Sequence, residues 1–179
     1  MKATGAQVIS ALRTELQSQV GRHLYAVLGT YEQLERFELD DLSQARGAGG
    51  NPLPVPVNLN ASLLGHIADD DLRKLIQDEA RYPLAARRRL DQQLRQVLTE
   101  LLRQSNCLIL KQLELMWAYA LDWAIFRTSA ANQHHLVLML PGERRADAIV
   151  LFHECDGRFQ RMLPPALVPD NHVWELSDG

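Results

Sequence analysis

The chain has 179 residues, of which 46% are hydrophobic and 23% charged, and its formal net charge is −3. This composition excludes a disordered chain, which would be poor in large apolar residues, and argues against a broadly basic nucleic-acid-binding face. The basic residues are unevenly divided, because 16 are arginine and only Lys2, Lys74 and Lys111 are lysine. Any chemistry that needs a lysine therefore has three candidates.

The two cysteines and the longest apolar stretch indicate where the protein resides. Cys107 and Cys155 follow no CxxC or Cys/His spacing, so we expect two buried, reduced thiols and no disulfide. The N-terminal segment is amphipathic and lacks the solid apolar block of a signal peptide. The stretch 113–126 is interrupted by Glu114 and Asp122 and falls short of the roughly 20 residues that span a bilayer. These features predict a soluble, cytoplasmic protein without membrane contact.

The first half of the chain alternates between helical and strand patterns. Val8, Ile9 and Leu12 share a helical face with two later apolar residues, which predicts an N-terminal helix over 6–20. The segment HLYAVLG is continuously apolar and predicts a buried strand. The predicted elements that follow are a short helix (30–45), a flexible loop rich in Gly and Pro (46–56) and a second strand in VPVNLN.

The second half continues this alternation. Leu90, Leu94 and Val97 lie on one face of a long predicted helix whose first turn holds Pro83. Short apolar strands separated by helices predict a parallel sheet covered on both faces. The expected fold class is therefore α/β: a single domain, 1–179, with a three-layer sandwich around a mainly parallel five-stranded sheet. The predicted elements are a helical stretch (63–78), the long helix (84–104), a third strand starting at CLILK, a helix (117–133), a fourth strand in HHLVLMLPG, a fifth in ADAIVLFHE and an irregular tail.

This order of elements is typical of nucleoside triphosphatases with a phosphate loop. In those proteins the first strand runs into GxxxxGK[ST], and a later strand ends in an Asp that orients Mg²⁺. Here the first strand is followed by a single glycine, Gly29, and Lys111 stands where the acid is expected, with Glu114 three residues later. Gly29, Lys111 and Glu114 are therefore candidates for a degenerate cleft, and no residue is assigned a catalytic, cofactor-binding or metal-binding role. Lys111 is either a structural residue at a strand end or the partner of Glu114 or Asp122 in a vacated nucleotide cleft.

Four segments between residues 57 and 176 resemble BrxF, a family of small P-loop-containing proteins of bacterial phage-exclusion (BREX) defence systems. The segments are VNLNASLLGHIADDDLRKL, LILKQLELMW, HHLVLMLPG and AIVLFHECDGRFQRM. The resemblance implies a P-loop-like fold and a role in bacterial antiviral defence. Because the N-terminal third lacks the glycine-rich loop and its lysine, it implies a member that has lost nucleotide binding.

Metal-capable side chains gather near two predicted strand ends, at His134, His135, His153, Glu154 and Cys155. Zinc ligands usually come in closely spaced pairs such as CxxC or HxxxH, and adjacent residues of a strand point to opposite faces. These histidines are therefore interpreted as surface or core residues and not as ligands.

Two clusters are candidates for interactions. Arg87, Arg88 and Arg89 form either a solvated helix face or a contact for DNA or an acidic partner. The aromatic residues around Trp117 and Trp123 are either core residues or a protein interface, and two tryptophans in a chain so poor in aromatics favour an interface.

The function that these patterns favour is a non-catalytic adaptor or accessory component of a bacterial antiphage defence complex, with other proteins of the complex as partners and no cofactor. One alternative is a nucleotide-binding, ATPase-like subunit. The other is a DNA-binding accessory protein that uses the face from Arg87 to Arg95.

Overall fold

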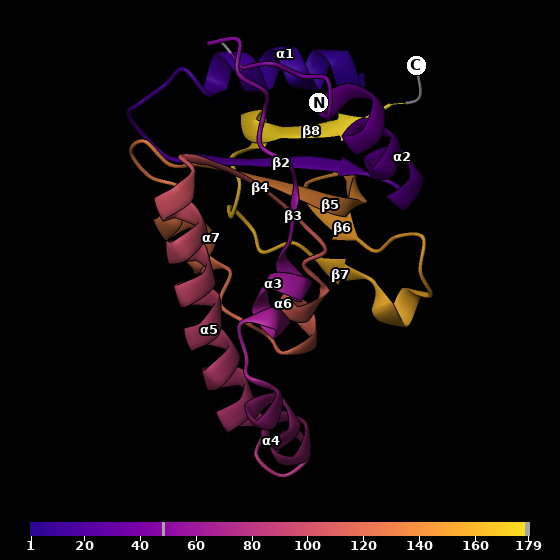
Figure 1. Cartoon of the computed structure of the whole chain (residues 1–179). Helices are drawn as coiled ribbons and strands as arrows, with labels where there is room; N and C mark the ends of the chain where they lie inside the picture. The colour runs from indigo at the N-terminus through magenta and orange to yellow at the C-terminus, as the bar shows by residue number, and fades with distance from the viewer. Residues whose placement is uncertain (48, 178–179) are drawn as a thin grey trace.

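The computed structural model, which describes residues 1–47 and 49–177, is built around a central sheet (Figure 1). Within these residues the strands lie in the order β1-β8-β2-β5-β4-β3, and every neighbouring pair on this path is parallel. Two further strands continue the sheet from β5 as an antiparallel extension. The strands are β1 (Lys2–Ala3), β2 (His23–Gly29), β3 (Val57–Asn58), β4 (Cys107–Lys111), β5 (His135–Arg145), β6 (Ala148–Leu151), β7 (Arg161–Met162) and β8 (Val173–Leu176).

Helices cover both faces of the sheet, which makes a three-layer α/β structure (Figure 1). One face is covered by α1 (Gly5–Glu15), α2 (Tyr31–Arg36) and the π-helix η1 (Phe37–Leu42). The other is covered by α3 (Leu59–Gly65), α4 (Asp69–Glu79), α5 (Pro83–Gln104), α6 (Glu114–Ala118) and α7 (Ala124–Ser129). Two single 3-10 turns, η2 (Gly157–Phe159) and η3 (Asp170–His172), lie in the C-terminal segment. The predicted α/β class with a mainly parallel sheet is confirmed, but the sheet has eight strands in the described residues where five were expected.

Strand β2 shows why its sequence is apolar throughout. Successive side chains of a strand point to opposite faces, and both faces of this strand are covered. Leu24, Ala26 and Leu28 join the core beneath α3 to α7, whereas Tyr25 and Val27 join the core beneath α1 and α2.

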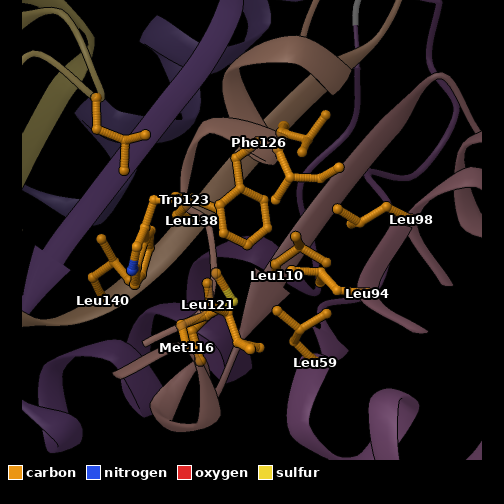
Figure 2. Close-up of a cluster of buried hydrophobic side chains, with 14 of the residues drawn as sticks. Leu59, Leu94, Leu98, Leu110, Met116, Leu121, Trp123, Phe126, Leu138 and Leu140 are labelled. Carbon is orange, nitrogen blue, oxygen red and sulfur yellow. The ribbon is translucent and has the colours of Figure 1, made fainter. Parts of the chain in front are cut away.

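The larger core lies between the sheet and α5, α6 and α7 (Figure 2). The Phe126 ring is fully buried and lies among side chains from β4, β5 and α5, with the Trp123 ring 5.5 Å away between centroids. Trp123 packs in turn on Trp117 at 4.2 Å, and Trp117 meets the edge of Phe152 at 5.1 Å. These ring contacts pack α6 and α7 against the end of the sheet.

The fifth predicted strand exists, but it does not run parallel to its neighbour. Residues 148–151 do form a strand, but β6 runs antiparallel to β5, because Arg145 pairs with Ala148 and only Ala146 and Asp147 connect them. A parallel crossover needs about a dozen residues or more. A connection of this length therefore allows only an antiparallel hairpin. Gly142 permits the close approach, since a Cβ there would lie 2.7 Å from the Val150 carbonyl oxygen.

The last parallel strand of the path comes from the tail that was expected to be irregular. β8 inserts between β1 and β2, with Val27 opposite Trp174. Its four residues are too few for a readable pattern and follow a proline-rich stretch, but they complete the sheet beside β2.

Several helix boundaries differ from the prediction. The N-terminal helix ends at Glu15 instead of residue 20, because the residues beyond it turn into solvent and Val20 is exposed. The helix predicted over 117–133 is two short helices separated at Ala120, whose φ of 48° is left-handed. The 63–78 stretch is divided into α3 and α4. Of the predicted flexible loop 46–56, residue 48 lies outside the described residues, and Leu53 within it is buried.

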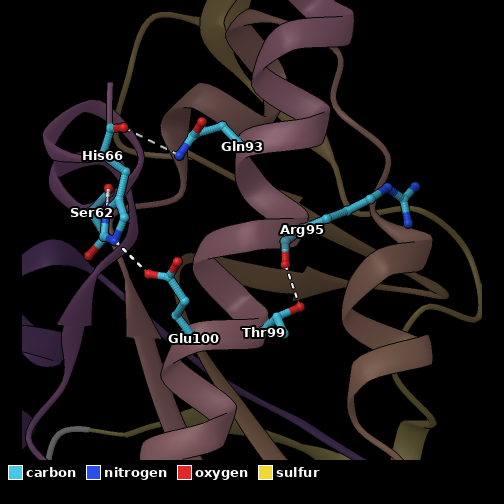
Figure 3. A network of polar contacts seen from close by, with 6 residues as sticks. All are labelled: Ser62, His66, Gln93, Arg95, Thr99 and Glu100. Atoms are coloured by element: carbon cyan, nitrogen blue, oxygen red, sulfur yellow. Dashed lines mark hydrogen bonds and ion pairs between the residues drawn. The ribbon is translucent and has the colours of Figure 1, made fainter. Parts of the chain in front are cut away.

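Polar contacts attach α3 to the long helix α5 (Figure 3). One ring nitrogen of His66, Nδ1, lies 2.7 Å from the Ser62 carbonyl oxygen, and the other, Nε2, lies 3.1 Å from Glu100 Oε2. Of the helices in the described residues, none is both long enough and apolar enough to cross a membrane.

Candidate functional site

A cleft lies at the carboxyl ends of β2, β4 and β5. Open α/β sheets bind ligands at this edge, where the connections from neighbouring strands leave to opposite faces. Here the chain after β2 enters α2 on one face, and the chain after β4 enters α6 on the other. The cavity between them has a volume of about 280 Å³ and is lined by residues that include Tyr31, Glu35, Glu38, Lys111, Glu114 and Pro141.

The start of α2 binds the protein's own side chains. Thr30 Oγ1 accepts a hydrogen bond from the Gln33 amide at 3.0 Å, and Gln33 Oε1 accepts one from the Thr30 amide at 2.9 Å. The Tyr31 amide donates to Glu154 Oε2 at 2.8 Å. The first amides of a helix are those that attract anions, so a carboxylate from the turn after β6 already lies where a phosphate would bind.

Gly29 has a packing role at the end of β2. A Cβ on this residue would lie 3.2 Å from Gln33 and 3.3 Å from Leu176, so the glycine lets α2 and β8 approach the strand closely. Gly29 pairs in register with Pro141 of β5, which is consistent with its position at the edge of the cleft.

Lys111 forms an ion pair that the sequence did not predict. Its Nζ donates to both carboxylate oxygens of Glu38, at 2.6 and 2.8 Å, and both side chains are half-buried. The expected partners, Glu114 and Asp122, are wrong. Glu114 instead accepts a hydrogen bond from Asn60 at 2.6 Å, and Asp122 lies 3.7 Å from Arg95 on the other side of α6 and α7.

Carboxylates dominate the electrostatics of the cleft. Glu35, Glu38 and Glu114 line it against the single ammonium of Lys111. Burial, followed by the negative charge of Glu114, Cys155 and Glu154, raises the pKa of Tyr31 to about 12. The negative charge of the cleft therefore disfavours binding of the phosphates of a nucleotide.

Breaking the Lys111–Glu38 pair gives a first prediction. Lys111→Met and Glu38→Gln are each expected to lower the free energy of unfolding by about 1–2 kcal/mol, because each leaves its former partner half-buried and uncompensated. The double variant is expected to lose less than the sum, with a coupling energy of about 1 kcal/mol in urea unfolding. Additive losses would contradict the pairing.

The arginine candidates are mostly neutralised by neighbouring acids. Arg89 lies 2.9 Å from Asp71, Arg87 lies 3.8 Å from Asp91, and Arg88 is exposed. A phosphate backbone would meet the acids together with the arginines, so this face is poorly suited to DNA.

The tryptophan candidates belong to the core of the chain. Trp123 is buried and Trp117 is half-buried against Phe152, so the interface that the sequence favoured for this pair is not what the packing supports.

The histidine-containing cluster is distributed over both ends of the sheet. His135 stacks on His23 at 4.2 Å at the amino ends of β5 and β2, where Cys107 is the β4 residue in register with His135. Glu154 and Cys155 lie at the opposite end, and the exposed Cys155 contradicts the expectation of two buried thiols. Among the described residues no group of three or more His, Cys, Asp or Glu side chains is arranged to hold a metal ion.

The sequence predicts that Gly29, Lys111 and Glu114 lie near one another. It did not predict that Glu38, Tyr31 and Glu154 lie at the same cleft. Tyr31, Leu34, Glu35 and Glu38 recur at helical spacing directly after a buried strand, and that pattern could have indicated a helix face directed at the strand end. Glu154 gives no such signal, because its approach to α2 depends on the β5–β6 hairpin.

Comparison of the chain with protein-family models, curated proteins and solved structures finds no match.

Proposed function

We propose that this chain is a non-catalytic adaptor with a phosphate-loop-like fold that has lost nucleotide binding and joins other proteins in a cytoplasmic bacterial antiphage defence complex. The setting follows from the resemblance to the BrxF family, and the loss of nucleotide binding follows from the cleft.

One observation carries the proposal. The cleft at the strand ends is occupied by the protein's own charges, because Glu154 accepts from the first amide of α2 and Lys111 is held by Glu38. A phosphate-loop protein uses the same strand–turn–helix junction to hold phosphates with backbone amides and a lysine. Here the connection from β2 to α2 has no lysine, and Lys111 approaches from β4 already paired.

Binding of a nucleotide would require three unfavourable changes. Glu154 would have to leave α2, the Lys111–Glu38 pair would have to open, and phosphates would have to lie beside Glu35 and Glu114. The cation of the lining, Lys111, is already paired, which favours a binding role for the surface of the protein over hydrolysis in the cleft.

The test has two arms. In calorimetric titration with Mg-ATP, and separately with ADP, we expect no saturable binding below about 1 mM, which corresponds to a binding free energy weaker than roughly −4 kcal/mol. In co-expression with the proteins encoded by the neighbouring genes, we expect the chain to co-purify in fixed proportion without added nucleotide.

The variant Glu154→Gln is the matched control for the cleft. It removes the charge that lies at α2 but keeps a hydrogen-bond acceptor, so it distinguishes a blocked site from a lost one. Micromolar affinity for Mg-ATP in the unaltered protein, or assembly that requires Mg-ATP, would overturn the proposal.

A further inference from the structure

A second cavity lies far from the cleft in sequence, between the start of α5, the turn before α7 and the C-terminal segment. Its volume is about 390 Å³, and its lining includes Arg87, Trp123, Arg127, Pro164, Pro165 and Leu167. The proposed adaptor function gives this cavity no role yet.

Arg127 is the unusual charge of this cavity. Its side chain is half-buried on α7, and it forms no ion pair with any other described residue. An arginine without an acidic partner can donate two parallel hydrogen bonds to a carboxylate.

The acid in this lining, Asp122, already has other partners. Asp122 accepts a hydrogen bond from the Ala124 amide at 2.9 Å, and its other oxygen lies 3.7 Å from Arg95. Arg87 lies 3.8 Å from Asp91, and its side chain is exposed. Arg127 is therefore the guanidinium of this lining that has no acidic partner among the described residues.

The remaining lining is apolar. It includes Pro164, Pro165, Leu167 and the buried Trp123, whose indole N–H makes no hydrogen bond to the described residues. Such a cavity suits a ligand that joins a carboxylate to an aliphatic group.

We infer that this cavity is a docking site for an acidic, leucine-like segment of a partner protein, with the carboxylate on Arg127 and the apolar side chain against Pro164 and Pro165. The inference rests on the proposed adaptor function and assigns it a contact surface. The apolar side chains of the lining, and the acids Asp91 and Asp122 beside the arginines, favour a peptide over a nucleic-acid backbone.

The test uses the full chain labelled with ¹⁵N, in which each of the 3 tryptophans gives one indole N–H signal. The signal of Trp123 is assigned with a Trp123→Phe sample. The probes are two blocked peptides, Ac-Leu-Glu-Leu-Glu-NH2 and Ac-Leu-Gln-Leu-Gln-NH2, which differ in their carboxylates alone. We expect saturable movement of the Trp123 signal with the first, and binding at least about fivefold weaker with the second, because charged hydrogen bonds are the stronger ones.

Two variants separate the site from general charge. Arg127→Gln is expected to reduce the Glu peptide to the affinity of the Gln peptide, whereas Arg88→Gln, an exposed arginine outside the lining, leaves it unchanged. The spectra themselves report whether each variant is folded, and Arg127→Lys, which keeps the charge, is expected to bind with intermediate affinity.

Three outcomes overturn the inference: equal binding of the two peptides, a motionless Trp123 signal, or movement produced only by duplex DNA of about 20 base pairs with a steep salt dependence. A parallel titration with Mg-ATP keeps the two proposals apart. Nucleotide binding would overturn the adaptor function alone, whereas a protein that binds neither nucleotide nor peptide would overturn the docking site alone.

Discussion

Replacing Phe126 with alanine is expected to lower the free energy of unfolding by about 3–5 kcal/mol, the usual loss for a large buried aromatic side chain. The ring is fully buried between the sheet and α5 and contacts Trp123, which in turn contacts Trp117, and Trp117 meets the edge of Phe152. Removal of the ring leaves a cavity that α7 can fill only by giving up these aromatic contacts. Urea unfolding, followed by circular dichroism, measures the loss.

Phe159→Ala is the matched control for this prediction. Phe159 is exposed in the η2 turn, where the guanidinium of Arg158 lies 4.9 Å from the centre of its ring, so its truncation is expected to change stability by less than about 0.5 kcal/mol. Equal losses in the two variants, or a loss below about 1 kcal/mol for Phe126→Ala, would mean that α6 and α7 do not pack on the sheet as described.

The spacing of apolar residues was sufficient to predict the helices and strands whose faces are buried in the core along their whole length. β2, β4 and β5 are apolar because both of their faces are covered. The apolar residues of α5 lie along one side because that side faces the core. The direction of β6 and the existence of β8 depend on partners distant in sequence. Four-residue segments carry too little pattern to reveal them.

The location of the cleft could be predicted from the sequence, but the ion pair that Lys111 forms in it was not predicted. Lys111 and Glu114 follow one apolar strand and Gly29 ends another, and parallel strands bring such ends together at one edge of the sheet. The partner of Lys111, Glu38, comes from η1. Glu38 shares a helical face with Tyr31 and Glu35, but Lys111 was paired with acids nearer to it in sequence.

The stability of the fold is expected to fall by about 3 kcal/mol as the pH drops from about 6.5 to about 4, because of the buried His135. Burial, and then the neighbouring His23, lower the pKa of His135 from 6.5 to about 4, against a hydrogen bond that the His135 ring donates to the Ser18 backbone and that favours protonation. The unfolded chain binds this proton first, so the contribution is complete above pH 6.5 and is lost as the pH falls toward 4.

The surroundings of His135 explain why the folded chain resists the proton. His23 stacks on it at 4.2 Å, and Nε2 of His23 and Nδ1 of His135 are buried without hydrogen-bond partners among the described residues. Tyr25 lies beyond His23 with its hydroxyl 3.4 Å from Glu15, and Cys107 is the neighbour on β4, where burial raises the pKa of the thiol to about 12. Glu15 is directed toward Tyr25 and lies 4.0 Å from His172, so it does not pair with the imidazolium of His135.

The variant His135→Phe keeps a stacked ring but cannot bind a proton, so its stability is expected to change less than that of the unaltered protein between pH 6.5 and 4. The difference between the two curves removes the contributions of all other titrating groups, since these are common to both proteins. Val137→Ala alters the same face of β5 without changing any titratable group, and its curve is expected to run parallel to that of the unaltered protein at every pH. If His135→Phe gave a parallel curve as well, the buried histidine pair would contribute nothing to acid sensitivity, and the acid loss would belong to the carboxylates of the surface and the cleft.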